Sequence, residues 1–234
     1  MRPPSDEIAE LRGQAFELWI RDRYEEADAR LQEIIARWPG FWKAHYDLVK
    51  SAMWQGDMKK AYAAVLRAQK QFPDALIFDR LAVESCIEIH DWGKAARHLN
   101  RLWGMNPWDP NLMMHYANVA HGLGEYELAV QLYEDCTECG QLNSGARINY
   151  ATSLYRIRQH KAALGILMGL AKDEPNNSLA LNNAGFILAA AGRPIEALDY
   201  CRRALDLEPN REAFWDSLGF VQMKTRNYQD ATRS

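Results

Sequence analysis

Apolar residues recur along the chain with the spacing of amphipathic helices, most plainly between Leu181 and Pro209. Leu181, Ala184 and Leu188 fall on one helical face, and the pattern then breaks at residues 192–194, which read Gly-Arg-Pro. A second apolar face follows the break and consists of Ala197, Cys201, Ala204 and Leu205. The pattern predicts two helices that are joined by a tight turn, with a proline ending the second.

The same pattern returns every 34 residues without an insertion or deletion. The alanine of the second helix recurs at Ala27, Ala61, Ala95, Ala129, Ala163, Ala197 and Ala231. The closing proline recurs at Pro39, Pro73, Pro107, Pro175 and Pro209, and Gln141 is the exception. A period of this length predicts stacked helix pairs in one array over residues 1–234. The predicted units are residues 8–41, 42–75, 76–109, 110–143, 144–177 and 178–211, with a partial seventh at 212–234.

Small residues are expected where the two helices of a unit cross. A larger side chain at the invariant alanine would force the helices apart, at a cost of about 1–3 kcal/mol. The facing positions on the first helices are also small or β-branched: Ala15, Val49, Val83, Ala117, Ala151, Gly185 and Gly219. Glycine at Gly56, Gly124 and Gly192 suits a turn with positive φ, whereas the other complete units carry Asp22, His90 and Arg158 there.

These features resemble the tetratricopeptide repeat family. The unit that carries the family pattern most fully is Trp215-x-x-Leu218-Gly219, followed by Tyr228 and Ala231. The resemblance covers about residues 8–231 and implies an all-α fold, a right-handed superhelical α-solenoid of helix-turn-helix repeats. It also implies that the first helices line a concave groove and that the second helices form the outer face.

Composition and charge narrow the classes of partner. The 234 residues are 48% hydrophobic and 25% charged, with a net charge of −3, so no basic excess favours nucleic acid. No apolar run reaches the roughly 18 residues that span a bilayer, which predicts no direct membrane insertion. Four cysteines form no disulfide framework, and the N-terminus lacks an apolar signal core. A cytoplasmic location is expected, and a periplasmic one stays open if a signal was removed.

Candidate chemistry is sparse. Cys136 and Cys139 form a C-x-x-C, but they occupy positions that are apolar in the other repeats, and no second pair accompanies them. His115 and His121 are six residues apart, which places them on different helical faces. No phosphate loop or catalytic signature is present. We therefore expect no metal, no cofactor and no catalysis.

The resemblance directs positions two, five, six, nine, twelve and thirteen of each unit into the groove. Three zones follow from this assignment. The first zone, in residues 8–75, is aromatic and basic. The second zone, in residues 76–109, is charged, and the third, in residues 110–211, is rich in amides. The candidate peptide-binding residues are Trp19, Tyr46, Lys50, Trp54, Arg80, Glu84, Glu88, Asn118, Asn149, Arg156 and Asn183. Phe16, Met53, Asn111, His115 and Asn182 also fall on these positions. Apolar partner residues are expected near Trp19, Tyr46 and Trp54, and a basic one near the two glutamates.

Asparagines in the third zone fit recognition of a peptide backbone. Asn is a poor residue in mid-helix, yet Asn149 and Asn183 stand one period apart. A carboxamide both donates and accepts, so it can hold an extended backbone whatever the side chains. The pair resembles the asparagine ladder in the repeat domain of O-linked N-acetylglucosamine transferases. Core packing is the alternative for the aromatics, and a solvated face is the alternative for the glutamates.

These features favour a non-enzymatic scaffold that binds an extended or helical segment of a protein partner in the concave groove. The partial seventh unit leaves two further hypotheses open. The chain could be the substrate-recruiting region of a larger enzyme, of the glycosyltransferase or sulfotransferase type, whose catalytic domain lies elsewhere. It could also self-associate through its apolar C-terminal end, where Phe214, Trp215 and Phe220 cluster.

Overall fold

The computed structural model describes residues 5–104, 109–140 and 142–231. The described residues are all-α, as the sequence predicts. The helices are α1 (Ser5–Ile20), α2 (Tyr24–Arg37), α3 (Trp42–Trp54), α4 (Met58–Gln71), α5 (Ile77–Glu88), α6 (Trp92–Trp103), α7 (Pro110–Leu123), α8 (Tyr126–Cys139), α9 (Ser144–Arg156), α10 (His160–Asp173), α11 (Ser178–Ala190), α12 (Pro194–Leu207) and α13 (Glu212–Ala231). Pro107 and Gln141, two positions of the predicted proline series, lie outside the described residues.

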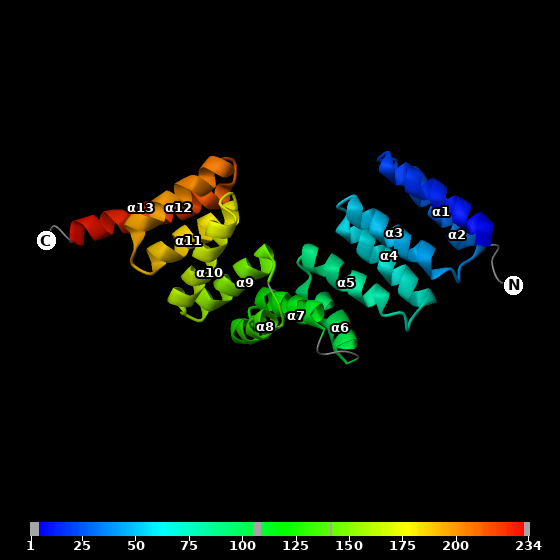
Figure 1. Cartoon of the computed structure of the whole chain (residues 1–234), viewed down its shortest axis with the longest axis horizontal. Coiled ribbons are helices and arrows are strands. Elements are labelled where there is room, and N and C mark those ends of the chain that lie inside the picture. Colours follow the sequence, from blue (N-terminus) through cyan, green and yellow to red (C-terminus); the bar gives the residue numbers. More distant parts are fainter. Residues whose placement is uncertain (1–4, 105–108, 141, 232–234) are drawn as a thin grey trace. The chain divides into compact units, whose positions relative to one another are not determined.

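The chain forms two compact units, Met1–His115 and Tyr116–Ser234. In the first unit, α1 packs on α2, α3 on α4 and α5 on α6, and each pair packs on the next (Figure 1). In the second, α9 packs on α10 and α11 on α12, while α13 packs on both helices of the α11–α12 pair. Each unit is thus a stack of helix pairs. A single array over residues 1–234 stays a prediction.

The predicted contact alanines lie in the core of the helix pairs. Ala27, Ala61, Ala95, Ala129, Ala163 and Ala197 are completely buried. In the first unit, two apolar clusters contain Ala27 and Ala61, one joining α1 to α3 and one joining α3 to α5. A larger cluster extends from α8 to α13 in the second unit. The core therefore lies between the helices of each pair and between neighbouring pairs.

Six turns share one backbone geometry, whether or not they contain glycine. Gly56, Gly124 and Gly192 have φ values of 74°, 82° and 83°. The non-glycine residues at the same place, Asp22, His90 and Arg158, have φ values of 55°, 56° and 66°. A left-handed conformation costs an L-residue roughly 1–2 kcal/mol. Packing of the flanking helices thus imposes the turn even where the residue type disfavours it.

We expect Arg158→Gly to raise the free energy of unfolding by about 0.5–1 kcal/mol, because relief of the left-handed strain exceeds the chain entropy that glycine adds to the unfolded state. Gly192→Ala is the matched reverse change and should lower stability by about 1 kcal/mol. Urea denaturation followed by circular dichroism measures both. Equal effects of the same sign would contradict the shared turn geometry.

The partial seventh unit differs from the prediction. The recurrence of the second-helix alanine at Ala231 predicts a second helix there, and residue 226, one period after Gly192, corresponds to the turn. Instead, α13 continues as one helix through both positions. A positive φ at Arg226 would strain the backbone, and the continuous helix avoids that strain. Gly219, the predicted crossing point of this unit, is exposed.

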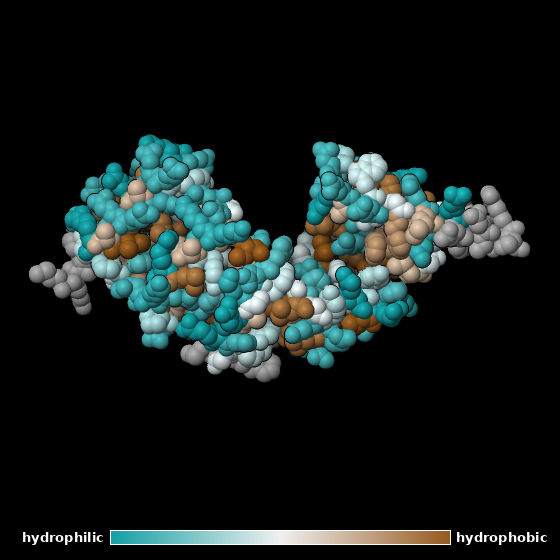
Figure 2. Space-filling model, turned by 180° about the vertical axis from the view of Figure 1, so that it is seen from behind, coloured by the Kyte–Doolittle hydropathy of each residue, from teal (hydrophilic) through white to brown (hydrophobic). Residues whose placement is uncertain are grey.

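Hydrophilic residues cover most of the surface that Figure 2 shows, and hydrophobic residues form separate small patches on it. None of the described helices is both long and apolar enough to cross a membrane.

Candidate functional site

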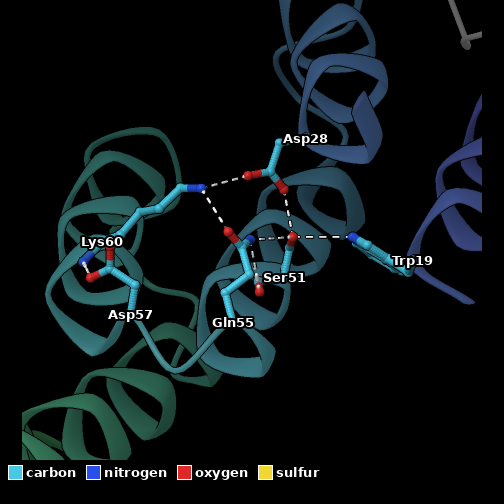
Figure 3. A network of polar contacts seen from close by, with 6 residues as sticks. All are labelled: Trp19, Asp28, Ser51, Gln55, Asp57 and Lys60. Atoms are coloured by element: carbon cyan, nitrogen blue, oxygen red, sulfur yellow. Dashed lines mark hydrogen bonds and ion pairs between the residues drawn. The ribbon is translucent and has the colours of Figure 1, made fainter. Parts of the chain in front are cut away.

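A buried polar network fixes Trp19 at the end of α1 (Figure 3). Its indole N–H donates to Ser51 Oγ over 3.1 Å, and the Ser51 hydroxyl donates in turn to Asp28 Oδ1 over 2.5 Å. Gln55 also donates to Ser51 Oγ, and Lys60 donates to Asp28 Oδ2 over 2.8 Å. The Ser51 hydroxyl therefore uses its donor and both acceptor positions. The network joins α1, α2, α3 and α4 around one rigidly held tryptophan.

An exposed aromatic surface is built on this support. The Trp54 ring packs edge-on against Trp19 with centroids 5.0 Å apart, and Phe16 meets Trp19 at 6.4 Å. Trp54 and Phe16 are nevertheless 54% and 56% exposed, and neighbouring Ile20 is 69% exposed. We call Phe16, Trp19, Ile20 and Trp54 the aromatic surface. Core packing, the alternative for these tryptophans, accounts for Trp19 only in part and does not account for Trp54.

Tyr46 and Lys50, also predicted for the first zone, lie on α3. The Tyr46 ring is half-buried and packs edge-on against Trp42 at 6.2 Å. Lys50 is half-buried and has no ion pair among the described residues. Both residues share α3 with Trp54 but are not part of its ring cluster.

The charged zone is divided between an ion pair and two unpaired acids. Arg80 donates to Asp109 Oδ2 over 2.7 Å, while Asp109 Oδ1 accepts from the backbone N–H of Asn111 at the start of α7. The Arg80 guanidinium holds the pKa of Asp109 below its usual range. Glu84 and Glu88 form no ion pair within the described part of the chain. Arg80 is thus paired within the fold, whereas the carboxylates of Glu84 and Glu88 are available to a cation of a partner.

A second network of buried polar contacts surrounds Asp79 of α5. Asp79 is completely buried, and its Oδ1 is shared by Gln69 at 2.9 Å, His98 Nδ1 at 2.8 Å and Arg101 at 3.3 Å. His98 Nε2 lies 3.3 Å from the Tyr62 hydroxyl. The other oxygen of this carboxylate, Asp79 Oδ2, is buried and has no hydrogen-bond partner among the described residues. We interpret the network as a structural link between α4, α5 and α6.

Asn118 and Asn149, two of the predicted peptide-binding residues, contact each other. Asn149 Nδ2 donates to Asn118 Oδ1 over 3.1 Å, and the buried Tyr133 hydroxyl donates to the same oxygen over 2.6 Å. Burial raises the pKa of Tyr133 far above its usual value, so the phenol stays a donor. Asn118 Oδ1 therefore already accepts two hydrogen bonds within the fold. A peptide N–H that bonded to this oxygen would have to displace the Asn149 or the Tyr133 donor.

Arg156 and Asn183 complete the predicted set. Arg156 is exposed, with its guanidinium carbon 5.6 Å from the centre of the Tyr126 ring. Asn183 is half-buried on α11, and its neighbour Asn182 is buried with an Oδ1 that has no hydrogen-bond partner among the described residues. The structure brings together Trp19 with Trp54 and Asn118 with Asn149. It also places Arg80 and Glu84 around one cavity with Asn111 and His115.

The sequence interpretation missed the buried serines. Ser51 and Ser85 stand one period apart, Ser153 stands two periods further on, and all three are completely buried. Ser153 Oγ lies 2.8 Å from His121 Nδ1, as Ser51 Oγ lies 3.1 Å from Trp19 Nε1. Both contacts join the twelfth position of one repeat to the tenth position of the next. Recurrence of serine at that tenth position is the signal that could have revealed them.

Thiol and metal chemistry find no support in the described residues. Cys136 is buried and Cys139 is exposed, so they do not share an environment. Burial raises the pKa values of Cys86, Cys136 and Cys201 to about 11, which keeps these thiols protonated and unreactive at neutral pH. No group of three or more metal-ligating side chains gathers in the part of the chain that the structure describes.

Comparisons with known families agree with the fold. Models of the tetratricopeptide repeat match residues 18–81 and 178–211. The two matched segments are tetratricopeptide repeats. Helical repeat proteins of this kind present extended surfaces to their binding partners. No curated protein matches the chain significantly in sequence.

Solved structures that resemble the chain share its fold at low identity. A chain of the APC/C hetero-tetramer Cut9-Hcn1 has a TM-score of 0.73 and 15% identity, with 92% of this chain and 42% of that chain covered. This chain thus spans less than half of that relative. A tetratricopeptide repeat protein from Parabacteroides merdae has a TM-score of 0.67, 14% identity, and coverage of 93% and 100%. YrrB, a protein with an unusual peptide-binding site, has a TM-score of 0.59, 16% identity, and coverage of 80% and 96%.

Proposed function

We propose that the chain is a non-enzymatic scaffold that binds an extended or helical segment of a partner protein on the first helices of its repeats. The observation that carries this proposal is the aromatic surface. Exposed aromatic rings that cluster on a soluble protein mark interaction sites, and tryptophan is enriched among the residues that dominate binding energy. The repeat architecture supports the same reading, because helical repeat proteins present extended binding surfaces.

The buried network of Figure 3 supports the proposal on energetic grounds. Binding costs less when the contacting side chains already have their bound conformation. Trp19 is held by its hydrogen bond to Ser51, and it holds Trp54 by ring packing at 5.0 Å. The surface is therefore both apolar and preorganised, which suits an apolar anchor residue of a partner.

The first test is selection of binding peptides from random dodecapeptides displayed on phage. We expect selected peptides to lose about 2 kcal/mol or more of binding free energy to Trp54→Ala, measured by fluorescence anisotropy, because a tryptophan anchor contributes that much. The control is Leu66→Ala, which removes a 42% exposed apolar side chain from α4, a second helix.

Circular dichroism would verify that both variants keep the fold, as expected for side chains that are largely exposed. Peptides that bind Trp54→Ala as tightly as the unaltered chain would contradict the assignment of this surface. The hypothesis of a substrate-recruiting region of a larger enzyme uses the same surface and stays a prediction. So does self-association through the apolar residues of α13.

A further inference from the structure

A second recognition feature lies one repeat away from the aromatic surface. A cavity of about 260 Å³ opens between α5, α6 and the first turns of α7. Sites that hold a whole small molecule are usually about 300–1,000 Å³, so this cavity is of a size for one side chain. Its lining residues are Arg80, Val83, Glu84, Leu99, Leu102, Asn111, Leu112 and His115.

The charges around the cavity leave one acid without a partner. Arg80 is neutralised by Asp109 over 2.7 Å. Glu84 lines the cavity and has no ion pair among the described residues. The local sum of Arg80, Asp109 and Glu84 is one negative charge. Glu88 follows one turn later on α5 and adds another outside the lining. The cavity therefore attracts a cation and repels an anion.

His115 adds a second unsatisfied acceptor. Its Nδ1 is buried and has no hydrogen-bond partner in the described part of the chain. Burial lowers the pKa of His115, which outweighs the opposing effect of the Glu84 carboxylate. The ring is therefore neutral at pH 7, and Nδ1 accepts a hydrogen bond when the proton resides on Nε2. A buried acceptor without a donor costs stability, so an occupant that donates to it is favoured.

We propose that this cavity binds a basic side chain of the partner peptide, with arginine preferred to lysine. An arginine meets each feature of the lining. Its planar guanidinium offers several donors to the Glu84 carboxylate and the His115 ring, which both line the cavity. Lysine offers the same charge from one ammonium and reaches fewer acceptors at once. This assignment rests on the proposed function and names the chemistry of the partner.

The test uses the tripeptide acetyl-Gly-Arg-Gly-amide as the probe and the side-chain NMR signals of His115 as the readout. We expect saturable shifts of these signals with the arginine peptide, weaker binding with lysine in its place, and no shift with its neutral citrulline analogue. Glu84→Gln should weaken arginine binding by about fivefold or more, because it removes the unpaired carboxylate. The matched control Glu88→Gln should change it by less than about twofold, because Glu88 is exposed and does not line the cavity.

Three results would overturn the assignment. They are a shift of His115 with acetyl-Gly-Asp-Gly-amide instead, equal binding by citrulline and arginine, and unchanged binding to Glu84→Gln. Phage-selected peptides that depend on Trp54 but carry no basic residue and ignore Glu84→Gln would reject this inference and leave the proposed function intact. If the arginine peptide shifts the His115 signals but no selected peptide depends on Trp54, the cavity assignment stands and the proposed role of the aromatic surface is rejected.

Discussion

Gly185→Ala should lower the free energy of unfolding by about 1–3 kcal/mol, the usual cost of overpacking a close contact. A methyl group added at Gly185 would lie 2.5 Å from Cys201 Sγ, 3.1 Å from the Ala197 carbonyl oxygen and 3.3 Å from the Cys201 backbone nitrogen. The first distance is far inside van der Waals contact. The other two involve the backbone of α12, which cannot move without separating the helix pair. Thermal or urea unfolding of the variant measures the loss.

Gly219→Ala is the matched control, one repeat period later. Among the described residues, nothing lies within 4 Å of a methyl group at Gly219, which is exposed on α13. Alanine is a better helix former by about 1 kcal/mol, so this substitution should stabilise the chain. Cys201→Ala combined with Gly185→Ala should restore part of the loss by removing the shortest contact. Destabilisation of similar size by both glycine substitutions would contradict this account of the helix crossing.

The same pair of glycines shows how far the sequence predicted the fold. The 34-residue period and the small residues at the crossing points depend on packing within one unit, which recurs along the chain. The pairs α1–α2, α3–α4, α5–α6, α9–α10 and α11–α12 could therefore be predicted from them. The fate of the seventh unit depends on whether a further helix covers α13. Gly219 fits the family pattern as well as Gly185 does, yet only Gly185 makes the contact. Local pattern cannot supply that information.

Predictions for the candidate site depended on position within the repeat. Position alone could not distinguish a side chain that is free to bind a partner from one that already forms a hydrogen bond or an ion pair within the fold. Trp54 was predicted and is exposed. Arg80 and Asn118 were predicted as ligands of a partner, but Arg80 pairs with Asp109 and Asn118 accepts from Tyr133. Their partners lie 29 and 15 residues away, so no local periodicity pairs them. These two contacts join residues that are close in space but that the 34-residue period does not relate to each other.

The contacts Trp19–Ser51 and His121–Ser153 are equivalent in the repeat and occur in separate compact units. In each, a ring nitrogen at the end of a first helix reaches a buried hydroxyl on the first helix of the next repeat. Such a contact resists sliding of one repeat against the next, because a shift would leave a buried polar group without a partner. The first of the two also fixes the aromatic surface, so stability and recognition are coupled at Ser51.

Lys60→Met should lower the free energy of unfolding by about 2 kcal/mol. The Asp28 side chain is only 7% exposed, and Lys60 Nζ at 2.8 Å is the cation that neutralises it. Methionine keeps the length of the side chain but leaves a buried carboxylate with only the Ser51 hydroxyl for support. Breaking a buried ion pair from one side is costly for this reason, and partial exposure of Lys60 moderates the loss. Arg30→Met, which removes the cation of the exposed pair with Glu33, should cost no more than about 0.5 kcal/mol.

The double variant Lys60→Met with Asp28→Asn separates charge from packing. If the loss arises from the uncompensated carboxylate, the neutral amide should recover at least half of it, so that the two substitutions are strongly non-additive. Simple additivity in urea denaturation would contradict this origin.

The same variants also test whether the polar network supports peptide binding at the aromatic surface. Asparagine can still accept from the Ser51 hydroxyl, which keeps Trp19 in place, so the double variant should bind Trp54-dependent peptides as the unaltered chain does.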